Sequence, residues 1–282
     1  GKSLLDVASE KNIMKNLKRV GFEADHTPFS LVIEIKKTFK DVKFIPIKNL
    51  IEEVSAIKTT EEIENIKSAI KISEKAFNEV LNLIKPGIAE LDIASEISYL
   101  QRKYGAEKDA FDIIVASGWR SALPHGVASA KKIKKGEFVV IDFGCVVNGY
   151  HSDITRTIVF GKASKEQRKI YQIVFDAQSK AIEQASSGLR ANLLDSIARD
   201  YIKQKGYGKF FGHSLGHGIG VEIHTLPRIS PKSNYILQAG NVITIEPGIY
   251  IPNFGGVRIE DDILIDSTPQ VLTTLPRNLI EI

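Results

Sequence analysis

Two aspartates on a predicted β-hairpin are the first residues whose spacing suggests chemistry. The segment from Val139 to Phe160 contains two strand-like runs around Asn148-Gly149, a dipeptide typical of a two-residue type I′ turn. Such a turn places Asp142 opposite Thr155, so Asp153 lies on the same face as Asp142. Two carboxylates that converge on a mostly apolar hairpin repel each other and resist burial, so we expect a cation between them. The alternative is a pair of solvent-facing aspartates on an edge hairpin.

A glycine-rich segment supplies histidines. His213 and His217 lie four residues apart between Gly212 and Gly220, and the glycines argue against a helical zinc pair. In extended backbone the two side chains share a face, and the glycines permit close approach of a ligand. A phosphate-binding loop is the rival interpretation, but the segment lacks the Lys-Ser/Thr ending. His224 follows seven residues after His217 and could be structural if it stands alone.

Two glutamates complete the set of chemically interesting residues. Glu246 and Glu260 each end an apolar, strand-like run, where a buried carboxylate is costly unless it is paired. We expect Asp261 and Asp262 to be the solvated continuation of the second run. Two aspartates, two glutamates and one histidine form a hard, oxygen-rich donor set that suits two Mn, Co, Fe or Zn ions. With a single histidine, a structural zinc site is disfavoured.

The composition describes an ordinary globular protein. The 282 residues are 43% hydrophobic and 26% charged, with a net charge of +4. The run from Lys131 to Gly136 is interpreted as a solvated loop rather than a nucleic-acid patch, and no apolar run is long enough to cross a membrane. The single cysteine, Cys145, has no partner for a disulfide, which predicts a reducing, cytoplasmic setting.

The elements that must position these residues predict an α+β fold. Helices are expected over residues 59–84 and 164–186, both opened by capping boxes, and over 90–103 and 192–205. Their order around the hairpin and the glycine-punctuated strands after residue 210 suggests two similar halves. Residues 1–52 are predicted to be a partial α/β domain, too short to bury a stable core alone, ahead of a catalytic domain over 53–282.

Several of these residues match the pattern of a known protein family. Five of them match, in order and context, the metal ligands of the pita-bread metallopeptidases, which include methionine aminopeptidase, aminopeptidase P and prolidase: Asp142, Asp153, His217 in Gly-His-Gly-Ile-Gly, Glu246 in Glu-Pro-Gly, and Glu260 in Arg-Ile-Glu-Asp. The resemblance implies a pita-bread catalytic domain with pseudo-twofold halves. It also implies that residues 1–52 are part of a creatinase-like amino-terminal domain.

The resemblance also implies roles for residues outside the ligand set. His125 resembles the histidine that contacts the substrate near the scissile bond, and His224 resembles the one that polarises the carbonyl group. His213 and Arg258 resemble features of the proline-specific branch on the substrate side, although Arg258 is also expected to contact the acidic cluster beside it. Arg228 resembles an arginine near the substrate carboxylate in some prolidases, which also occurs in related aminopeptidases. Thr225 departs from the pattern, because many relatives have glutamate there.

The reaction implied is hydrolysis of the bond before proline in short peptides by a metal-bridged hydroxide, with manganese favoured among the divalent metals. Glu246 would accept the proton of the water, and His224 would stabilise the oxyanion. An aminopeptidase needs an open exit beyond proline, and the part of the amino-terminal domain that would cover the site is expected to be missing from residues 1–52. We therefore expect an Xaa-Pro aminopeptidase rather than an Xaa-Pro dipeptidase. A non-catalytic pita-bread binding protein is the less favoured alternative. The family also implies a homodimer, with no membrane or nucleic-acid partner.

Overall fold

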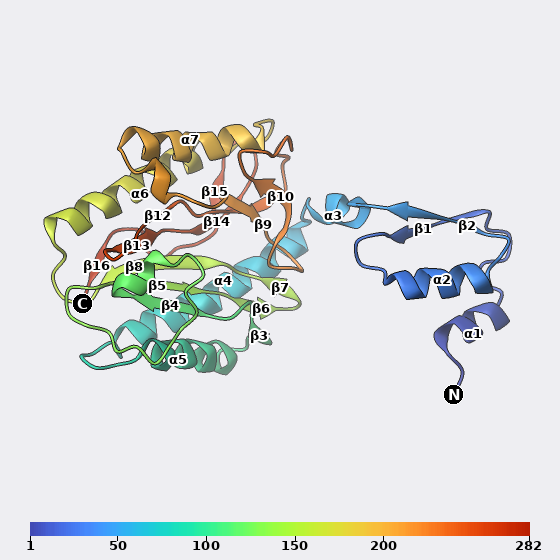
Figure 1. Ribbon diagram of the computed structural model, residues 1–282, viewed down its shortest axis with the longest axis horizontal. Coiled ribbons are helices and arrows are strands. Elements are labelled where there is room, and N and C mark those ends of the chain that lie inside the picture. Colours follow the sequence, from blue (N-terminus) through green and yellow to red (C-terminus); the bar gives the residue numbers. More distant parts are fainter. The chain divides into compact units, whose positions relative to one another are not determined.

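The computed structural model describes residues 1–282, and internal contacts divide them into two units. Unit 1 is Gly1–Val54 and unit 2 is Ser55–Ile282. Figure 1 shows the helices and strands of both units. The residues singled out for chemistry all lie in unit 2, so its elements are the ones that build the site.

Four long helices belong to unit 2: α4 (Thr60–Leu81), α5 (Glu90–Lys103), α6 (Lys165–Gln184) and α7 (Ala191–Gln204). The capping boxes predicted for the first and third are confirmed, because the Thr59 and Ser164 side chains accept hydrogen bonds from the backbone N–H groups of Glu62 and Gln167. The start of α7 differs from the prediction, since Arg190 precedes the helix without a side-chain cap. None of the helices is both long and apolar enough to cross a membrane.

Short strands make up the rest of unit 2. In chain order they are β3 (Lys108–Asp109), β4 (Ile114–Ser117), β5 (Phe138–Phe143), β6 (Cys145–Val147), β7 (Tyr150–His151), β8 (Ile154–Val159), β9 (Gly216–Gly218), β10 (Thr225–Ile229), β11 (Val242–Ile245), β12 (Gly248–Ile251), β13 (Gly255–Arg258), β14 (Asp261–Leu264), β15 (Gln270–Val271) and β16 (Ile280–Glu281). Two 3₁₀ helices, η1 (Gly118–Ala122) and η2 (Gly208–Phe210), lie between them.

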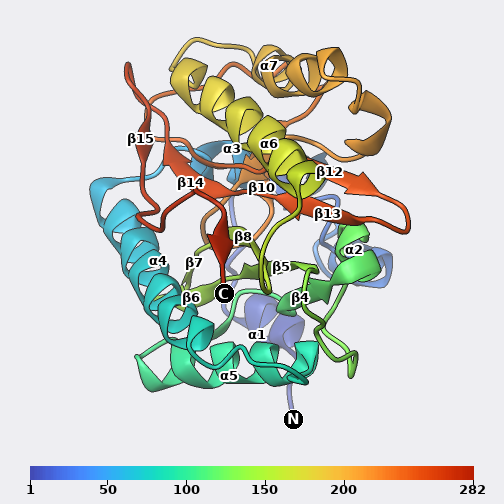
Figure 2. The same cartoon turned by 90° about the vertical axis from the view of Figure 1, so that its left-hand side faces the viewer.

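The sheets lie between two pairs of helices. A four-stranded sheet has the order β16-β8-β5-β4, and a five-stranded sheet has the order β10-β9-β11-β14-β15. Figure 2 shows α4 and α5 on one side of the strands and α6 and α7 on the other. Two hydrophobic clusters follow this division: one includes Phe77 and Ile97 from α4 and α5, and the other includes Val174 and Leu194 from α6 and α7. The mixed helix and sheet content agrees with the predicted α+β class.

The central hairpin has the predicted register. Asn148 and Gly149 have φ angles of +49° and +79°, and Asp142 on β5 lies opposite Thr155 on β8. The ladder is interrupted at Gly144, where a Cβ atom would collide with the carbonyl oxygen of Ser152. Glycine is therefore required at the position where the two backbones approach most closely, just beside the predicted ligand Asp153.

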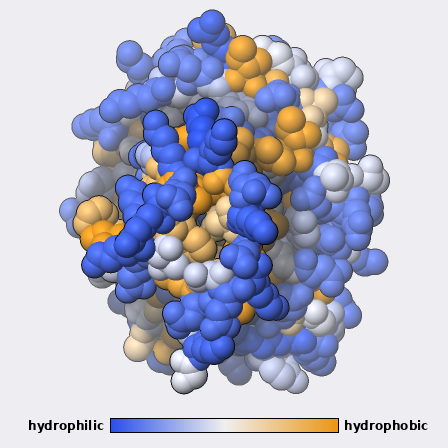
Figure 3. Space-filling view, turned by 90° about the vertical axis from the view of Figure 1, so that its right-hand side faces the viewer, coloured by the Kyte–Doolittle hydropathy of each residue, from blue (hydrophilic) through white to orange (hydrophobic).

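Unit 1 contains α1 (Leu4–Glu10), β1 (Arg19–Glu23), α2 (Phe29–Thr38) and β2 (Lys43–Ile47), and α3 (Leu50–Ser55) follows at its boundary. The two strands pair in parallel. Val32 is the single buried hydrophobic residue of this unit, whereas Leu4 and Phe29 are 89% and 79% exposed. On the face of the molecule drawn in Figure 3, groups of hydrophobic side chains (orange) lie among hydrophilic ones (blue). The small core follows from the short chain length, as expected.

Candidate metal centre

Three of the five predicted ligands converge. Asp153 precedes β8, His217 lies on β9, and Glu260 stands between β13 and β14. Their ligand atoms all lie within 4.8 Å of one another, and Asp153 Oδ2 is 3.6 Å from His217 Nε2. Three residues spread over more than 100 positions in sequence therefore meet at one point, at a separation suited to a shared cation.

The other two predicted ligands border this cluster. Glu246 Oε1 lies 3.5 Å from His217 Nε2. Asp142 Oδ2 accepts a hydrogen bond from Arg258 Nη2 at 2.7 Å, while the buried Asp142 Oδ1 has no hydrogen-bond partner. A buried carboxylate oxygen rarely remains unpaired, because losing its hydration without compensation is costly. The free oxygen of Asp142 therefore fits a role as a metal ligand.

The electrostatics of the cluster also fit a cation. Burial, followed by the negative charge of Glu260, raises the pKa of Asp153 well above its ordinary value. Burial likewise raises the pKa of Glu260, to which the charge of Glu246 adds, and it raises the pKa of Glu246 to about 8. These shifts mean that the protein alone does not balance the charges of its carboxylates. Divalent cations with oxygen-preferring chemistry would balance them.

Glycines make room for His217. A Cβ atom at Gly216 would collide with the carbonyl oxygen of Thr244, and one at Gly218 would collide with that of Leu226. Strand β9 therefore pairs closely with its neighbours, as expected from the glycine-rich sequence. Burial, and then the positive charge of His224, lowers the pKa of His217 to about 4. The ring is thus neutral near pH 7, the state in which a histidine binds metal.

Hydroxyl groups hold two of the carboxylates. Thr155 Oγ1 donates to Glu260 Oε2 at 2.5 Å, and Thr244 Oγ1 donates to Glu246 Oε1 at 3.3 Å. Thr155 Oγ1 also accepts a hydrogen bond from Arg258 Nε at 2.9 Å. Such outer contacts fix the orientation of metal ligands. Sequence analysis missed both threonines, although Thr155 was already placed on the hairpin face of Asp142 and Asp153.

Arg258 links several of the groups around the predicted metal ligands through hydrogen bonds. It is only 3% exposed, and its guanidinium donates to Asp142, to Thr155, to the Tyr250 hydroxyl at 2.8 Å and to the Pro124 carbonyl at 3.1 Å. From the sequence, a substrate-side role was predicted for this arginine, together with a contact to the acidic cluster beside it. Its hydrogen bonds to Asp142 and its neighbours agree with the contact to acidic residues, and the substrate-side role stays a prediction. Tyr250, four residues after Glu246, was not anticipated by sequence analysis.

The predicted substrate-side histidines lie near the cluster. The ring of His224 is 4.3 Å from that of His217, centroid to centroid, and His224 is exposed. His213 Nε2 lies 3.0 Å from the Tyr250 hydroxyl, and His213 Nδ1 lies 4.0 Å from Glu246 Oε2. His125 is exposed and directly follows Pro124, whose carbonyl accepts a hydrogen bond from Arg258 Nη1 at 3.1 Å. The structure therefore gathers all three histidines around the same centre.

Arg228 is exposed on β10 near the same centre. Its positive charge contributes to lowering the pKa of both His217 and His224, after the effect of burial and, for His217, of neighbouring His224. No carboxylate of the protein forms an ion pair with this guanidinium within 4.0 Å. An exposed arginine beside the cluster is suited to binding an anionic group of a ligand.

The prediction that Asp261 and Asp262 are solvated is wrong. Both are fully buried. Asp261 Oδ1 forms an ion pair with Arg156 at 2.7 Å, and Asp262 Oδ2 accepts the backbone N–H of Asp153 at 3.1 Å. Arg156 also donates to the backbone carbonyl of Glu260 at 2.6 Å. Asp262 Oδ1 has no hydrogen-bond partner. The partners that do exist are distant in sequence, so local sequence pattern could not reveal that both carboxylates are buried.

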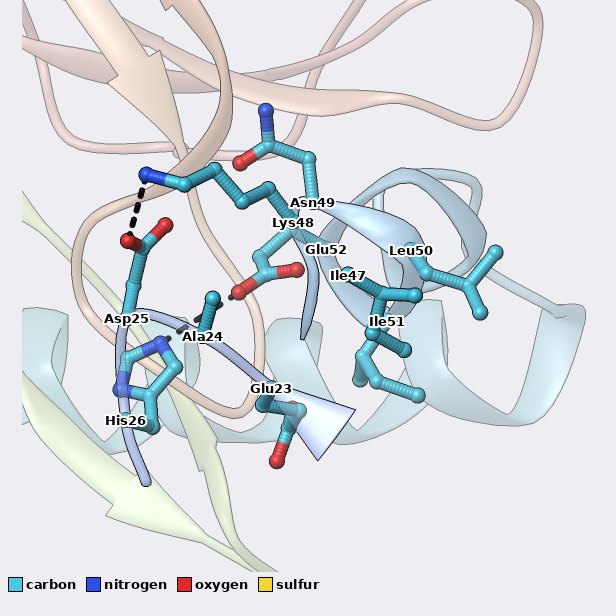
Figure 4. Close-up of a pocket in the computed structure, with 10 residues that line it drawn as sticks. All are labelled: Glu23, Ala24, Asp25, His26, Ile47, Lys48, Asn49, Leu50, Ile51 and Glu52. Atoms are coloured by element: carbon cyan, nitrogen blue, oxygen red, sulfur yellow. Dashed lines mark ion pairs between the residues drawn. The ribbon is translucent and has the colours of Figure 1, made fainter. Parts of the chain in front are cut away.

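A separate concavity in unit 1 does not share this chemistry. It is lined by residues 23–26 and 47–52, drawn in Figure 4. Lys48 Nζ lies 2.8 Å from Asp25, and His26 Nε2 lies 3.4 Å from Glu52. These charged side chains are largely exposed and pair with one another, so they lack the crowded, buried carboxylates of the centre in unit 2.

Comparisons with known proteins agree with the geometry. The profile of metallopeptidase family M24 matches residues 64–267, and that of the creatinase/prolidase N-terminal domain matches residues 2–57. The Xaa-Pro dipeptidase of Pyrococcus furiosus is 50% identical, with 95% of this chain and 77% of the relative covered. A solved Xaa-Pro dipeptidase from Bacillus anthracis has a TM-score of 0.97 at 44% identity, and the match covers 100% of this chain and 79% of that one. A solved X-Pro aminopeptidase from Thermotoga maritima has a TM-score of 0.95 at 44% identity, covering 100% and 80% of the two chains.

The predicted family and fold are confirmed by these matches, since the profile spans more than half of the chain and several relatives exceed 40% identity. The carboxylate cluster with its single histidine lies within the matched region. The chain therefore belongs to metallopeptidase family M24 and has the pita-bread fold, preceded by a creatinase/prolidase N-terminal domain.

Proposed function

We propose that this protein is an Xaa-Pro dipeptidase that hydrolyses the bond before a carboxyl-terminal proline. The observation that carries the proposal is the exposed Arg228 on β10, because this strand pairs with β9, which holds His217. A dipeptide has a free carboxylate one residue beyond the scissile bond, and an unpaired carboxylate in a pocket is costly. This proposal replaces our sequence-based preference for an aminopeptidase, because relatives at 50% and 47% identity are Xaa-Pro dipeptidases.

We further propose that two divalent metal ions, manganese first among them, bind the five clustered residues: Asp142, Asp153, His217, Glu246 and Glu260. The unpaired Asp142 Oδ1 and the mutual repulsion of the carboxylates support this assignment. When bound, such ions supply the Lewis acidity that makes water nucleophilic near neutral pH. The protein supplies the orientation of the carboxylates through Thr155, Thr244 and Arg258.

The remaining roles follow from charge and position. Glu246 would accept the proton of the attacking water and pass it to the leaving proline nitrogen. His224, exposed beside His217, would donate a hydrogen bond to the oxyanion. His125 and His213 would contact the peptide, and Arg228 would bind its carboxylate. Because its hydrogen bonds go to protein groups, Arg258 would position Asp142 rather than bind the substrate.

The position of the boundary between the two domains is also a proposal. We assign residues 1–52 to the amino-terminal domain and 53–282 to the catalytic domain. The separation of internal contacts at Val54 and the extents of the two family matches support a boundary in this region.

The decisive experiment compares kcat/KM for an Xaa-Pro dipeptide and an Xaa-Pro-Xaa tripeptide. We expect the parent to prefer the dipeptide and Arg228→Ala to lose that preference. A hydrogen bond to a charged group contributes about 1.5–3 kcal/mol, which corresponds to about 10–150-fold in kcat/KM.

Arg102→Ala, which changes a half-exposed arginine on α5, is the matched control and should leave the ratio unchanged. A parent that prefers the tripeptide would instead support an Xaa-Pro aminopeptidase. A metal-loaded parent that cleaves neither peptide would contradict both activities.

A further inference from the structure

A partly buried ion pair on α7 is not accounted for by the proposed reaction. Asp195 is 1% exposed, and its carboxylate pairs with Arg199 through two contacts, Nε to Oδ2 at 2.6 Å and Nη2 to Oδ1 at 2.8 Å. This is a bidentate arrangement, and it is more directional than the contact of a single ammonium group.

The pair binds the backbone of the segment that precedes β9. Arg199 donates to the carbonyl groups of Phe211 at 3.1 Å and His213 at 2.7 Å, and Asp195 Oδ1 accepts the N–H of Leu215 at 3.0 Å. The guanidinium also lies over the Phe211 ring, 4.3 Å from its centroid. Three backbone groups within five residues are thus held by one ion pair. We call residues 211–215 the 211–215 segment.

The 211–215 segment leads directly into the metal centre. Its Leu215 carbonyl accepts the backbone N–H of Glu246 at 2.8 Å, and His217 follows two residues later. Its His213 ring reaches the Tyr250 hydroxyl, which in turn accepts a hydrogen bond from Arg258. A displacement of this segment would therefore move His213 and, through the backbone, both His217 and Glu246.

We propose that Asp195 and Arg199 are positioning residues that set the geometry of His217, Glu246 and His213. Neither side chain contacts the ligand cluster, so their effect passes through the backbone of the 211–215 segment. The inference rests on the proposed metallopeptidase function for its catalytic consequence. Its consequences for metal affinity and for local backbone stability do not depend on which peptide is cleaved.

The variants must avoid leaving a buried charge without a partner, since that alone can unfold a protein. Arg199→Lys keeps the charge, but an ammonium group cannot reproduce the planar contacts with the carboxylate and two carbonyls. The double variant Asp195→Asn/Arg199→Gln removes both charges together. Glu64→Gln, which removes an exposed ion pair with Lys67 on α4, is the matched control.

Three measurements test the proposal on the full chain: amide hydrogen exchange of residues 211–217, manganese affinity by calorimetry, and kcat and KM for an Xaa-Pro dipeptide. For Arg199→Lys we expect faster exchange in this stretch, about tenfold weaker manganese binding and about tenfold lower kcat, with KM within about threefold of the parent. The double variant should show the same pattern, and Glu64→Gln should match the parent.

A double-mutant cycle with His213→Asn separates positioning from general destabilisation. If the pair acts partly through His213, the loss in kcat for Arg199→Lys should be smaller in the His213→Asn background. Unchanged exchange, or faster exchange with manganese affinity and kcat within twofold of the parent, would overturn the proposal. Absence of peptidase activity in the parent would refute the proposed function, while exchange and manganese affinity would still decide the positioning role.

Discussion

Replacing Thr155 by valine should weaken metal binding more than its effect on folding would suggest. Thr155 is fully buried, and its hydroxyl donates to Glu260 at 2.5 Å and accepts from Arg258 at 2.9 Å. Valine preserves the shape of the side chain but removes both hydrogen bonds. The change leaves Arg258 Nε without this acceptor and frees the Glu260 carboxylate to rotate.

The expected magnitude follows from these two contacts. A hydrogen bond to a charged group contributes about 1.5–3 kcal/mol, and burial of the new methyl group returns about 0.8 kcal/mol. With both hydrogen bonds lost and the methyl group gained, we expect the free energy of unfolding to fall by about 2–5 kcal/mol. A unit of this size loses about 2–4 °C in Tm per kcal/mol, so Tm should fall by about 4–20 °C. Loss of an outer contact to a metal ligand should weaken manganese binding by about 10–100-fold.

Thr157→Val is the matched control for this experiment. Thr157 lies on the same strand and is equally buried, but its hydroxyl bonds to the backbone N–H and carbonyl of Arg258 rather than to a carboxylate. Calorimetric titration with manganese and thermal melts of the metal-free proteins provide the two readouts. Equal manganese affinities for the two variants at similar Tm would refute the idea that Thr155 orients Glu260.

Other changes give further tests. Asp153→Asn should abolish peptidase activity while far-ultraviolet circular dichroism stays unchanged, because the amide keeps the volume of the side chain and removes a negative charge from the cluster; activity within tenfold of the parent under matched metal would contradict the ligand assignment. His224→Ala should lower kcat by about 10²–10³ and leave manganese affinity near that of the parent, which calorimetry would check. Burial lowers the pKa of Lys58 from 10.5 to about 8. Between these two pH values Lys58 is protonated in the unfolded chain but not in the folded one. The free energy of unfolding of the parent should therefore rise with pH in this range. Lys58→Met should accordingly raise Tm at pH 7, and the gain should shrink from about pH 8 to 10.5; a gain independent of pH would exclude the lysine charge as its cause.

Local signals in the sequence were sufficient for the central hairpin and its register. Asn148-Gly149 accepts the positive φ angles of a type I′ turn, and the turn then dictates that Asp142 faces Thr155. The capping boxes at Thr59 and Ser164 were equally reliable, because each joins residues only three positions apart. The order and context of the five carboxylate and histidine positions were also sufficient to identify the family.

Tertiary structure alone decided which charges are buried and what compensates them. Asp261 and Asp262 looked like a solvated acidic pair, yet both are buried. Arg156 pairs with Asp261, and the backbone N–H of Asp153 binds one oxygen of Asp262; each partner is more than 100 residues away. Asp195 lies within the predicted helix over residues 192–205, yet its carboxylate accepts the backbone N–H of Leu215. Residues that are close in sequence predict turn geometry and helix caps, because those features involve only neighbouring residues. The cost of burying a charge depends on partners brought together by long-range folding, so it cannot be read from neighbouring residues.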